Sequence, residues 1–465
     1  MNIGLNAIEQ NKSLILEVER HIWQNPETGY REWKTHDYLV GVFKSLGLEP
    51  KFFDRIPASI AIKSAKDGKD RVFEKIPGFY VDFDTGREGP RLAVFAEMDG
   101  LLIPTHPESD PKTGAVHACG HHAQCAAIVG VAAAFSAPGA LDGLSGSIRL
   151  IVVPAEEGIE RDFRNDLIKK GVIRYIHGKK ELMFRGLLDD VDLAFMIHTA
   201  QGKCLFCEKG TNGNIQKKFT FIGKSSHAAD PHEGINALYA ANVAINAANA
   251  LRETFTEKDV IRFHPIITSG GTAVNAIPDK VTVEAYVRGA SLKAYSQINK
   301  KINRAFAAAA ASLGCRLIIN DICGSAPRLY DQKMIDVFSS AGAAVLGSDN
   351  IDMDRSWDSG CSDFGDITQV MPGVHPHIGG AAGISHGSDY KIADPVLACV
   401  DSAKIQVNAA VMLLENGAAL AKEIIKNNSP AYSSIKEFLA ATDEIDLERE
   451  AVIYEDNGNV SLCFT

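Results

Sequence analysis

The pattern of hydrophobic and polar positions predicts an α/β domain in the first part of the chain. Short runs that are apolar throughout, at 92–96, 148–153 and 191–197, are separated by helical segments, of which 123–135 is the most apolar. Strands without polar alternation are typical of a parallel sheet that helices cover on both faces. A helical region over 14–48 precedes them, interrupted by the polar sequence NPETGYRE.

A different pattern begins near position 215. It predicts strand, helix, two strands, helix and strand, at 217–222, 236–251, 261–268, 281–288, 290–313 and 316–320. This β-α-β-β-α-β order is that of a ferredoxin-like unit. The α/β pattern then resumes near 329 and ends in a long apolar helix over 396–425.

These patterns predict an α/β fold, with a mostly parallel sheet between helices and an inserted ferredoxin-like α+β domain. The expected boundaries are 1–213 and 325–427 for the two parts of the first domain, 214–324 for the insert, and 428–465 for a C-terminal appendage. A charged segment at 67–75 is expected to be a surface loop or insertion.

Composition and charge narrow the class of protein. The chain has 465 residues, 46% of them hydrophobic, a formal charge of -10 and a pI near 5.8, which disfavour a nucleic-acid binder with a basic surface. The apolar runs 126–135 and 305–313 are too short to span a bilayer, and no secretion leader opens the chain. Nine scattered cysteines do not resemble a disulfide framework. We therefore expect a cytoplasmic protein with neither nucleic-acid nor membrane partners.

Polar residues follow three of the predicted strands. Glu97 and Asp99 follow the first, Glu156 and Glu157 the second, and His198 ends the third. In open α/β sheets, ligands bind beyond the carboxyl ends of the strands. The sequence therefore predicts an active site at this edge of the sheet.

The run HACGHH, residues 117–122, adds ligands of the kind that zinc prefers. Cys119 and His121 can converge on a metal from a tight loop, and a bound metal would convert the thiol to a thiolate. A glycine-bearing turn with an unrelated histidine cluster is the alternative for such a run by itself. Neighbouring residues of an extended chain point to opposite sides, so one of Glu156 and Glu157 can bind metal while the other handles a proton.

Other candidates remain open from the residues alone. His386 lies in a glycine-rich loop that suits a late ligand, but His375 and His377 compete with it. Cys204 and Cys207 form a C-x-x-C pair without a second pair or a thioredoxin-like setting, so we interpret them as structural.

Six motifs together resemble one family, the di-metal aminoacylase and carboxypeptidase amidohydrolases. They are AEMDGL, HACGHH, PAEEG, MIHT, SSHAADPHEGINA and SGGTAVNAIPD, in the family's order, and the resemblance covers about 16–425. It is strongest to aminobenzoyl-glutamate utilization proteins and weaker to plant auxin–amino-acid conjugate hydrolases.

The resemblance implies a role for each matching position. Cys119, His121, Glu157, His198 and His386 would hold two zinc or manganese ions, with Glu156 as general base and Asp99 orienting a ligand imidazole. His227, Asn275 and Arg288 of the insert would bind substrate. His227, and with it Asn275, would reach the active site of a partner subunit in a homodimer formed through the insert.

Amide hydrolysis by a metal-activated water is therefore the predicted activity, on an N-acyl amino acid, an aminobenzoyl-glutamate-like conjugate or a small dipeptide. Two departures from the family stand out. His122 occupies a position where relatives often have Asp or Asn, and Glu97 replaces the Asp of some of them. Two alternatives are a thiol hydrolase with Cys119 as nucleophile and His121 or His122 as base, and a binding protein without turnover.

Overall fold

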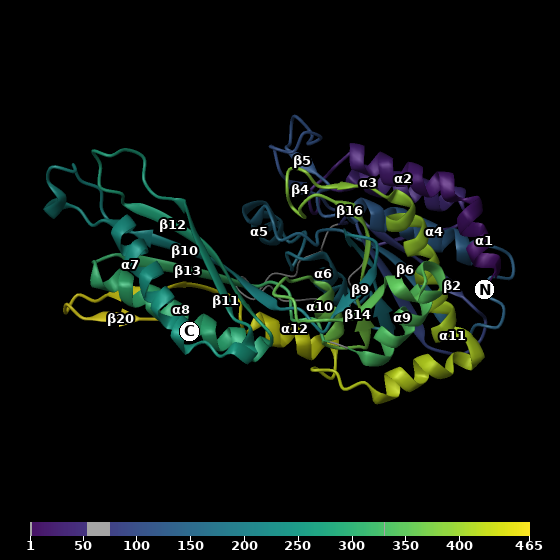
Figure 1. The fold of residues 1–465 in the computed structure, drawn as a ribbon. Helices are drawn as coiled ribbons and strands as arrows, with labels where there is room; N and C mark the ends of the chain where they lie inside the picture. The colour runs from purple at the N-terminus through teal and green to yellow at the C-terminus, as the bar shows by residue number, and fades with distance from the viewer. Residues whose placement is uncertain (1, 54–74, 330) are drawn as a thin grey trace. The chain divides into compact units, whose positions relative to one another are not determined.

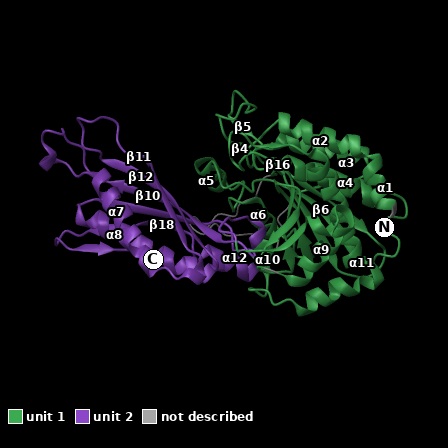
Figure 2. Cartoon of the chain, viewed as in Figure 1, with its two compact units in different colours: residues 1–209, 329–357, 366–435 green, residues 210–328, 358–365, 436–465 purple. Residues whose placement is uncertain are grey.

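The structure is a computed structural model that describes residues 2–53, 75–329 and 331–465, and the chain forms two compact units (Figures 1 and 2). The first unit comprises Met1–Lys209, Leu329–Trp357 and Asp366–Ile435. The second comprises Gly210–Arg328, Asp358–Gly365 and Lys436–Thr465. The predicted surface segment at 67–75 lies outside the described residues, except for Lys75.

A six-stranded sheet forms the centre of the first unit, with the order β1-β2-β6-β3-β7-β15. Strands β6, β3, β7 and β15 are parallel, and β1 and β2 are antiparallel additions at one side, so the prediction of a mostly parallel sheet is confirmed. The strands are β1 Lys51–Phe52, β2 Phe79–Asp84, β3 Arg91–Glu97, β6 Ser147–Val153, β7 Leu193–Phe195 and β15 Gly373–Val374.

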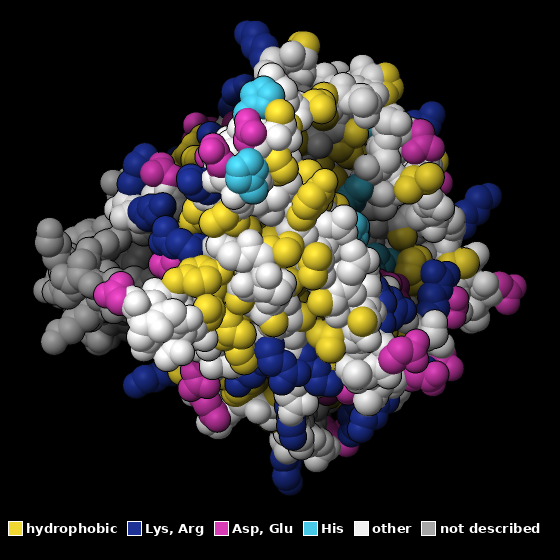
Figure 3. Space-filling view, turned by 90° about the vertical axis from the view of Figure 1, so that its left-hand side faces the viewer, with side chains coloured by type: hydrophobic (Ala, Val, Ile, Leu, Met, Phe, Trp, Pro, Cys, Tyr) yellow, Lys and Arg dark blue, Asp and Glu magenta, His cyan; other side chains and the backbone are white. Residues whose placement is uncertain are grey.

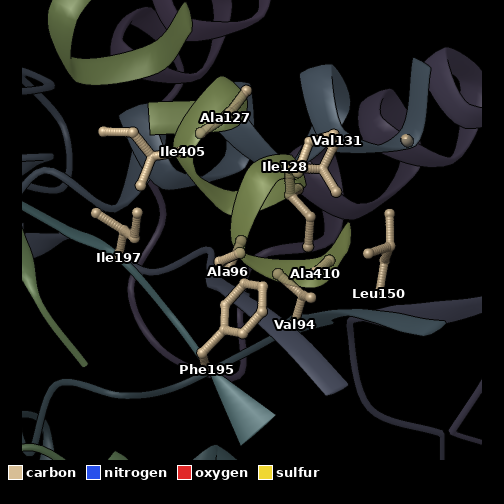
Figure 4. Close-up of a cluster of buried hydrophobic side chains, with 14 of the residues drawn as sticks. Val94, Ala96, Ala127, Ile128, Val131, Leu150, Phe195, Ile197, Ile405 and Ala410 are labelled. Atoms are coloured by element: carbon tan, nitrogen blue, oxygen red, sulfur yellow. The ribbon is translucent and has the colours of Figure 1, made fainter. Parts of the chain in front are cut away.

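Helices cover both faces of this sheet, which explains why its interior strands β3 and β6 are apolar along most of their length. On one face, α4 (His121–Ser136) and α11 (Ser402–Asn427) pack on alternate strand residues such as Val94 and Phe195 (Figure 4). On the other face, α6 (Gly178–Phe184) is buried along its whole length and lies against Val153. The remaining helices of this unit are α1 Asn2–Gln10, α2 Lys12–Gln24, α3 Trp33–Ser45, α5 Arg161–Lys170 and α9 Gln332–Leu346.

The first unit also contains two smaller sets of short strands. One set has the order β14-β9-β16-β17, with β8 paired to β16, and a separate pair joins β4 to β5. Their bounds are β4 Leu101–Leu102, β5 Ala115–Val116, β8 His198–Gln201, β9 Leu205–Glu208, β14 Ile351–Arg355, β16 His377–Ala382 and β17 Lys391–Ile392, and a short helix α10 spans Phe364–Thr368.

The segment Val396–Asn427, a π-helical stretch followed by α11, is long and apolar enough to cross a membrane by length and composition. Within its most apolar window, 72% of the residues are buried inside the structure, which is also true of core helices in folded domains. Non-helical backbone at Glu415 to Ala418 kinks α11.

The second unit has the predicted ferredoxin-like order of elements. An antiparallel sheet with the order β11-β12-β10-β13-β18 packs against two helices. The elements are β10 Gly213–Ile222, α7 Ala237–Ala250, β11 Arg262–Ser269, β12 Lys280–Gly289, α8 Leu292–Ser312 and β13 Arg316–Cys323. Alternate residues of β10 and β13, such as Phe219, Phe221 and Ile319, point into its core.

The C-terminal residues differ from the expected appendage, because most of them are part of this second unit. Strand β18 (Leu447–Glu450) extends the sheet beyond β13, and β19 (Val452–Tyr454) with β20 (Val460–Leu462) forms a hairpin. Helix α12 (Ile435–Asp443) connects to them. Ala451 and Val452 are completely buried in the core of the unit, which holds the segment in place.

Candidate metal centre

The strand order places the predicted site residues at one edge of the sheet. Strands β6, β3 and β7 are neighbours, so the segments that follow their carboxyl ends begin side by side. The imidazole Nε2 of His121 lies 3.2 Å from Glu97 Oε2 and 4.0 Å from Glu156 Oε2. The carboxylates of two strand ends therefore meet at the start of α4.

The loop before α4 brings Cys119 and His121 to the same place. Gly120 between them has a φ of 103°, and a Cβ atom there would collide with the hydroxyl oxygens of Thr199 and Tyr390. A glycine is required in this left-handed, closely packed position. The thiol Sγ of Cys119 then lies 3.4 Å from His198 Nε2.

Two groups of ligand atoms share the sulfur of Cys119. One consists of Cys119, His121 and His198, and the other of Cys119, Glu157 and His386, with all ligand atoms of a group within 4.8 Å of one another. Each group offers the sulfur, nitrogen or oxygen donors that zinc and manganese accept. A third group, Glu97, His121 and Glu156, shares His121 with the first.

Hydrogen bonds orient the donor atoms toward these groups. His121 Nδ1 donates to the carbonyl oxygen of Asp99 at 2.8 Å, and its distance to Asp99 Oδ1 is 3.2 Å. The other carboxylate oxygen of Asp99 accepts from the backbone N–H of Glu157 at 2.9 Å. His198 Nδ1 lies 2.7 Å from the carbonyl oxygen of Thr199. Both imidazoles are thereby left with Nε2 turned toward Cys119 and its neighbours, as metal-binding imidazoles require.

The structure also distinguishes among His375, His377 and His386, the three histidines that compete as a ligand. His386 Nε2 lies 3.3 Å from Glu157 Oε1, and its backbone N–H donates to the carbonyl of Ala118. His377 instead pairs with Glu208, with Nδ1 and Oε2 3.4 Å apart, and stacks on Phe206. The His375 ring lies beside His198 and His377 at centroid distances of 5.9 and 5.3 Å. Among the three, the ligand groups include only His386.

The electrostatics of the site fit a bound cation. Burial and the neighbouring Cys119 together raise the pKa of Glu157 to about 7. The pKa of Cys119 lies well below its usual value because His121 and His198 outweigh the effect of burial. Within the described residues, the buried atoms His121 Nε2 and Glu157 Oε1 have no hydrogen-bond partner. A bound divalent cation would neutralise the buried anionic side chains and give these two atoms a partner.

Two buried groups at this site were missed by sequence reasoning. Lys179 on α6 forms an ion pair with Glu97, and both side chains are inaccessible to solvent. Tyr390 donates its hydroxyl hydrogen to the carbonyl oxygen of Cys119 at 3.1 Å. Neither residue belongs to a recognisable ligand motif. Lysine is ordinarily a surface residue, and Tyr390 follows a polar loop, so nothing in the sequence indicated either side chain at a buried site.

The three predicted substrate residues belong to the second unit. The segments of His227 and Asn275 are adjacent there, because Ala228 N–H donates to the Asn275 carbonyl and His227 bridges to Ala276. Arg288 lies on β12, and its Nη1 donates to the carbonyl oxygen of Ser359 at 3.3 Å. Their predicted roles toward substrate stay predictions.

Comparison with known proteins agrees with the fold. Residues 209–313 match the model of the peptidase dimerisation domain. Human Xaa-Arg dipeptidase is 30% identical over 400 residues, which cover 83% of this chain and 81% of that protein.

Solved structures share the fold. A dinuclear metal-binding peptidase of the M20 family from Bacillus subtilis has a TM-score of 0.63 and 19% identity, covering 87% of this chain and 99% of that one. An aminobenzoyl-glutamate utilization protein from Klebsiella pneumoniae has a TM-score of 0.62 and 20% identity, with 86% and 97% coverage.

Fold, inserted domain and clustered donors together define a metallopeptidase-type hydrolase of amide or peptide bonds. The chain belongs to the M20 peptidase family. The predicted resemblance to the aminoacylase and carboxypeptidase amidohydrolases is thereby confirmed.

Proposed function

We propose that this protein hydrolyses the amide bond of a dipeptide or N-acyl amino acid, with two divalent cations held by Cys119, His121, Glu157, His198 and His386. One observation carries the proposal: Cys119 is common to two groups of donor atoms, each compact enough for one ion. The ions, zinc or manganese, would supply Lewis-acid activation of water and of the scissile carbonyl.

Glu156 is the proposed general base. It follows β6 directly beside the ligand Glu157, its Oε2 lies 4.0 Å from His121 Nε2, and its side chain is partly accessible, as a group that must meet water and substrate needs to be. Glu156 would take a proton from the attacking water and return it to the leaving amine. Asp99 would keep His121 and Glu157 in place through the contacts described above.

The second unit would supply the substrate contacts. Arg288 would hold a substrate carboxylate through paired charge-assisted hydrogen bonds. His227 would donate to the oxyanion that forms during attack, an effect worth roughly 3–4 kcal/mol. In the family resemblance, His227 and Asn275 act on the site of a partner subunit, so the proposed enzyme is a homodimer assembled through the inserted domain.

The inserted domain exposes apolar side chains on α7 and on the edge strand β11. Tyr239 and Val243 on α7 and Ile266 and Ile267 on β11 are exposed, and β11 is an edge strand with an unpaired side. Figure 3 shows hydrophobic side chains gathered on the side of the chain that is turned toward the viewer. A second copy of β11 and α7 would cover such a surface with the same residues, as a two-fold interface requires.

Dipeptides with a C-terminal basic residue are the substrates we favour, followed by N-acyl amino acids and aminobenzoyl-glutamate. The human relative named for Xaa-Arg substrates is similar over most of both chains, which supports this order. Nine free cysteines support the expected location in a reducing compartment, the cytoplasm.

The experiment that tests this proposal combines metal content with turnover. The purified protein should contain about two equivalents of zinc or manganese, and it should hydrolyse members of a dipeptide and N-acyl amino acid panel. Chelation should abolish hydrolysis, and added metal should restore it. Glu156→Gln should retain both metal equivalents and lose turnover by a factor of about 100 or more. Near-normal turnover in that variant would show that Glu156 does not transfer the proton.

A thiol hydrolase is the second candidate, because Cys119 Sγ and His198 Nε2 are 3.4 Å apart and Cys119 has a lowered pKa. The base would then be His198 or the expected His121, both of which contact the thiol, whereas His122 pairs with Glu19. Hydrolysis that persists after complete removal of metal would favour this mechanism.

A further inference from the structure

A buried ion pair adjoins the two donor groups that share Cys119. Lys179 Nζ pairs with Glu97 Oε1, and both side chains have at most 1% of their surface exposed. Burying two charges costs several kcal/mol per ion before their attraction is counted. Because this pair is almost completely buried beside the proposed catalytic centre, it calls for a functional explanation.

The backbone around α6 brings Lys179 to this place. Gly178, at the start of the helix, lies so close to the carbonyl oxygen of Pro154 that a Cβ atom would collide with it. Its N–H donates to the carbonyl of Ala155 at 3.0 Å. The helix is thereby fixed to the same strand end that carries Glu156 and Glu157, and Lys179 follows directly.

The Glu97 carboxylate is held on both of its oxygens. Oε1 accepts from Lys179, and Oε2 accepts from Gln124 Nε2 at 2.9 Å. Oε2 is also 3.2 Å from His121 Nε2, the nitrogen that faces Cys119. Glu97, His121 and Glu156 form a third compact group of donor atoms. Glu97 thus lies between the lysine and the proposed ligand.

We propose that Lys179 is a positioning residue, whose ammonium holds the Glu97 carboxylate turned toward His121 so that Glu97 strengthens cation binding at the Cys119–His121–His198 group. This inference rests on the metal site proposed above. Without Lys179, the Glu97 carboxylate loses the partner of one oxygen and is free to rotate away from His121. Outer partners of metal sites typically contribute a factor of about 10 to 100 in metal affinity.

The test measures metal binding rather than turnover. Metal-free protein is titrated with Mn²⁺ by calorimetry and with Zn²⁺ by chelator competition, in the wild type, Lys179→Met, Glu97→Gln and the double variant. We expect Lys179→Met to weaken one of the two equivalents by about 10- to 100-fold and to leave the other unchanged. In the Glu97→Gln background, Lys179→Met should cause no additional loss, because the lysine acts through that carboxylate.

Lys180 supplies a matched control on the same helix. It is equally buried, but it pairs with Asp366, with Nζ and Oδ2 3.7 Å apart. Lys180→Met should lower the stability of the fold, as loss of any buried partner does, and leave both metal affinities unchanged.

Each outcome decides the matter. Unchanged affinities in Lys179→Met, unchanged affinities in Glu97→Gln, or a lysine effect that persists in the Glu97→Gln background would overturn the inference. If Lys179→Met does not fold, Lys179→Gln, which removes the charge and keeps a polar side chain, replaces it in each of these comparisons. A wild-type protein that binds no metal would refute the proposed function itself. Two bound equivalents with no effect of Lys179 would refute only the positioning role.

Discussion

At the scale of residues, Cys119 and the other candidate ligands could be predicted from the types of residue that gather at the strand ends. Cysteine, histidine and paired glutamates are uncommon at strand ends and in tight glycine loops, so their coincidence at three strand ends indicates chemistry. The structure places all five predicted ligands in the two donor groups. The residues by themselves left His375, His377 and His386 open, since all three lie in loops or short strands rich in glycine. The family resemblance selected His386, which is the one of the three in a donor group.

Lys179 shows the limit of the same reasoning. A Lys-Lys pair before an apolar segment resembles a solvated surface, because lysine is almost never fully buried. Its burial depends on a carboxylate 82 positions earlier and on the close approach of Gly178 to Pro154. No local pattern in the sequence reports such a long-range pairing.

Another charged residue, Asp82, predicts a dependence of stability on pH. Asp82 lies opposite Arg149 in the β2–β6 ladder, with Oδ1 and Nε 2.7 Å apart, and Lys51 is 3.1 Å from Oδ2. Burial raises the pKa of Asp82, but Arg149 and Lys51 outweigh it and lower the pKa below the usual value. Because the folded-state pKa is lowered, the ion pair stabilises at pH values above the unfolded pKa of about 4, and this contribution is lost as the pH falls.

Asp82→Asn should therefore lower the free energy of unfolding by about 1–3 kcal/mol at pH 7. The difference from wild type should shrink below about pH 4. Urea unfolding of both proteins at several pH values measures this difference in the free energy of unfolding. Asp84→Asn, at an exposed position of the same strand, is the control and should change stability by less than about 0.5 kcal/mol. An equal loss at all pH values would mean that the ion pair is not the cause.

At the scale of elements, strands and helices with strong apolar patterns were predicted within a few residues. Strand β3 was expected at 92–96 and spans Arg91–Glu97, and α8 was expected at 290–313 and spans Leu292–Ser312. Strand β18 was missed because its sequence LERE has no apolar alternation, and pairing with β13 holds it. Helix α1 was also missed, since the helical pattern was recognised only from Leu14.

The C-terminal segment predicts an effect of its removal on the second unit. Strand β18 covers the β13 edge, and Val452 and Phe438 are completely buried. Burial of each such side chain contributes about 1.5–3 kcal/mol, so deletion of residues 436–465 should cost the unit several kcal/mol. The β13 edge would then be open to pairing with other chains, which promotes aggregation.

Thermal unfolding and light scattering of the truncated protein measure both effects. Val460→Asp, a substitution at an exposed position of the same segment, serves as the control and should behave like wild type. A truncated protein with wild-type unfolding and no aggregation would show that β18 is dispensable for the second unit.

For the whole molecule, the proposed metal ligands and the predicted substrate residues lie in different units of the chain. All proposed ligands belong to the first unit, while His227, Asn275 and Arg288 belong to the second. The sheet of the second unit ends in β11 on one side and β18 on the other, so both are edge strands. Val243 on α7 and Ile266 on β11 have exposed side chains.

Charge placed on this surface should therefore prevent dimerisation. Val243→Glu combined with Ile266→Glu should convert the protein to a monomer, measured by light scattering coupled to size-exclusion chromatography, because like charges would meet across a two-fold axis. Leu313→Glu, at an exposed position at the end of α8, is the matched control and should stay dimeric.

Complementation then tests whether His227 acts on the site of the partner subunit. His227→Ala and Glu156→Gln subunits should each be inactive alone. After mixing and subunit exchange, heterodimers should regain hydrolysis, because one of their two sites combines an intact Glu156 with an intact His227. If each site were completed by its own chain, every site in the mixture would carry one defect and no activity would return. The monomeric Val243→Glu, Ile266→Glu variant should bind metal normally and hydrolyse poorly, since its first unit keeps every ligand and lacks only the partner's contribution.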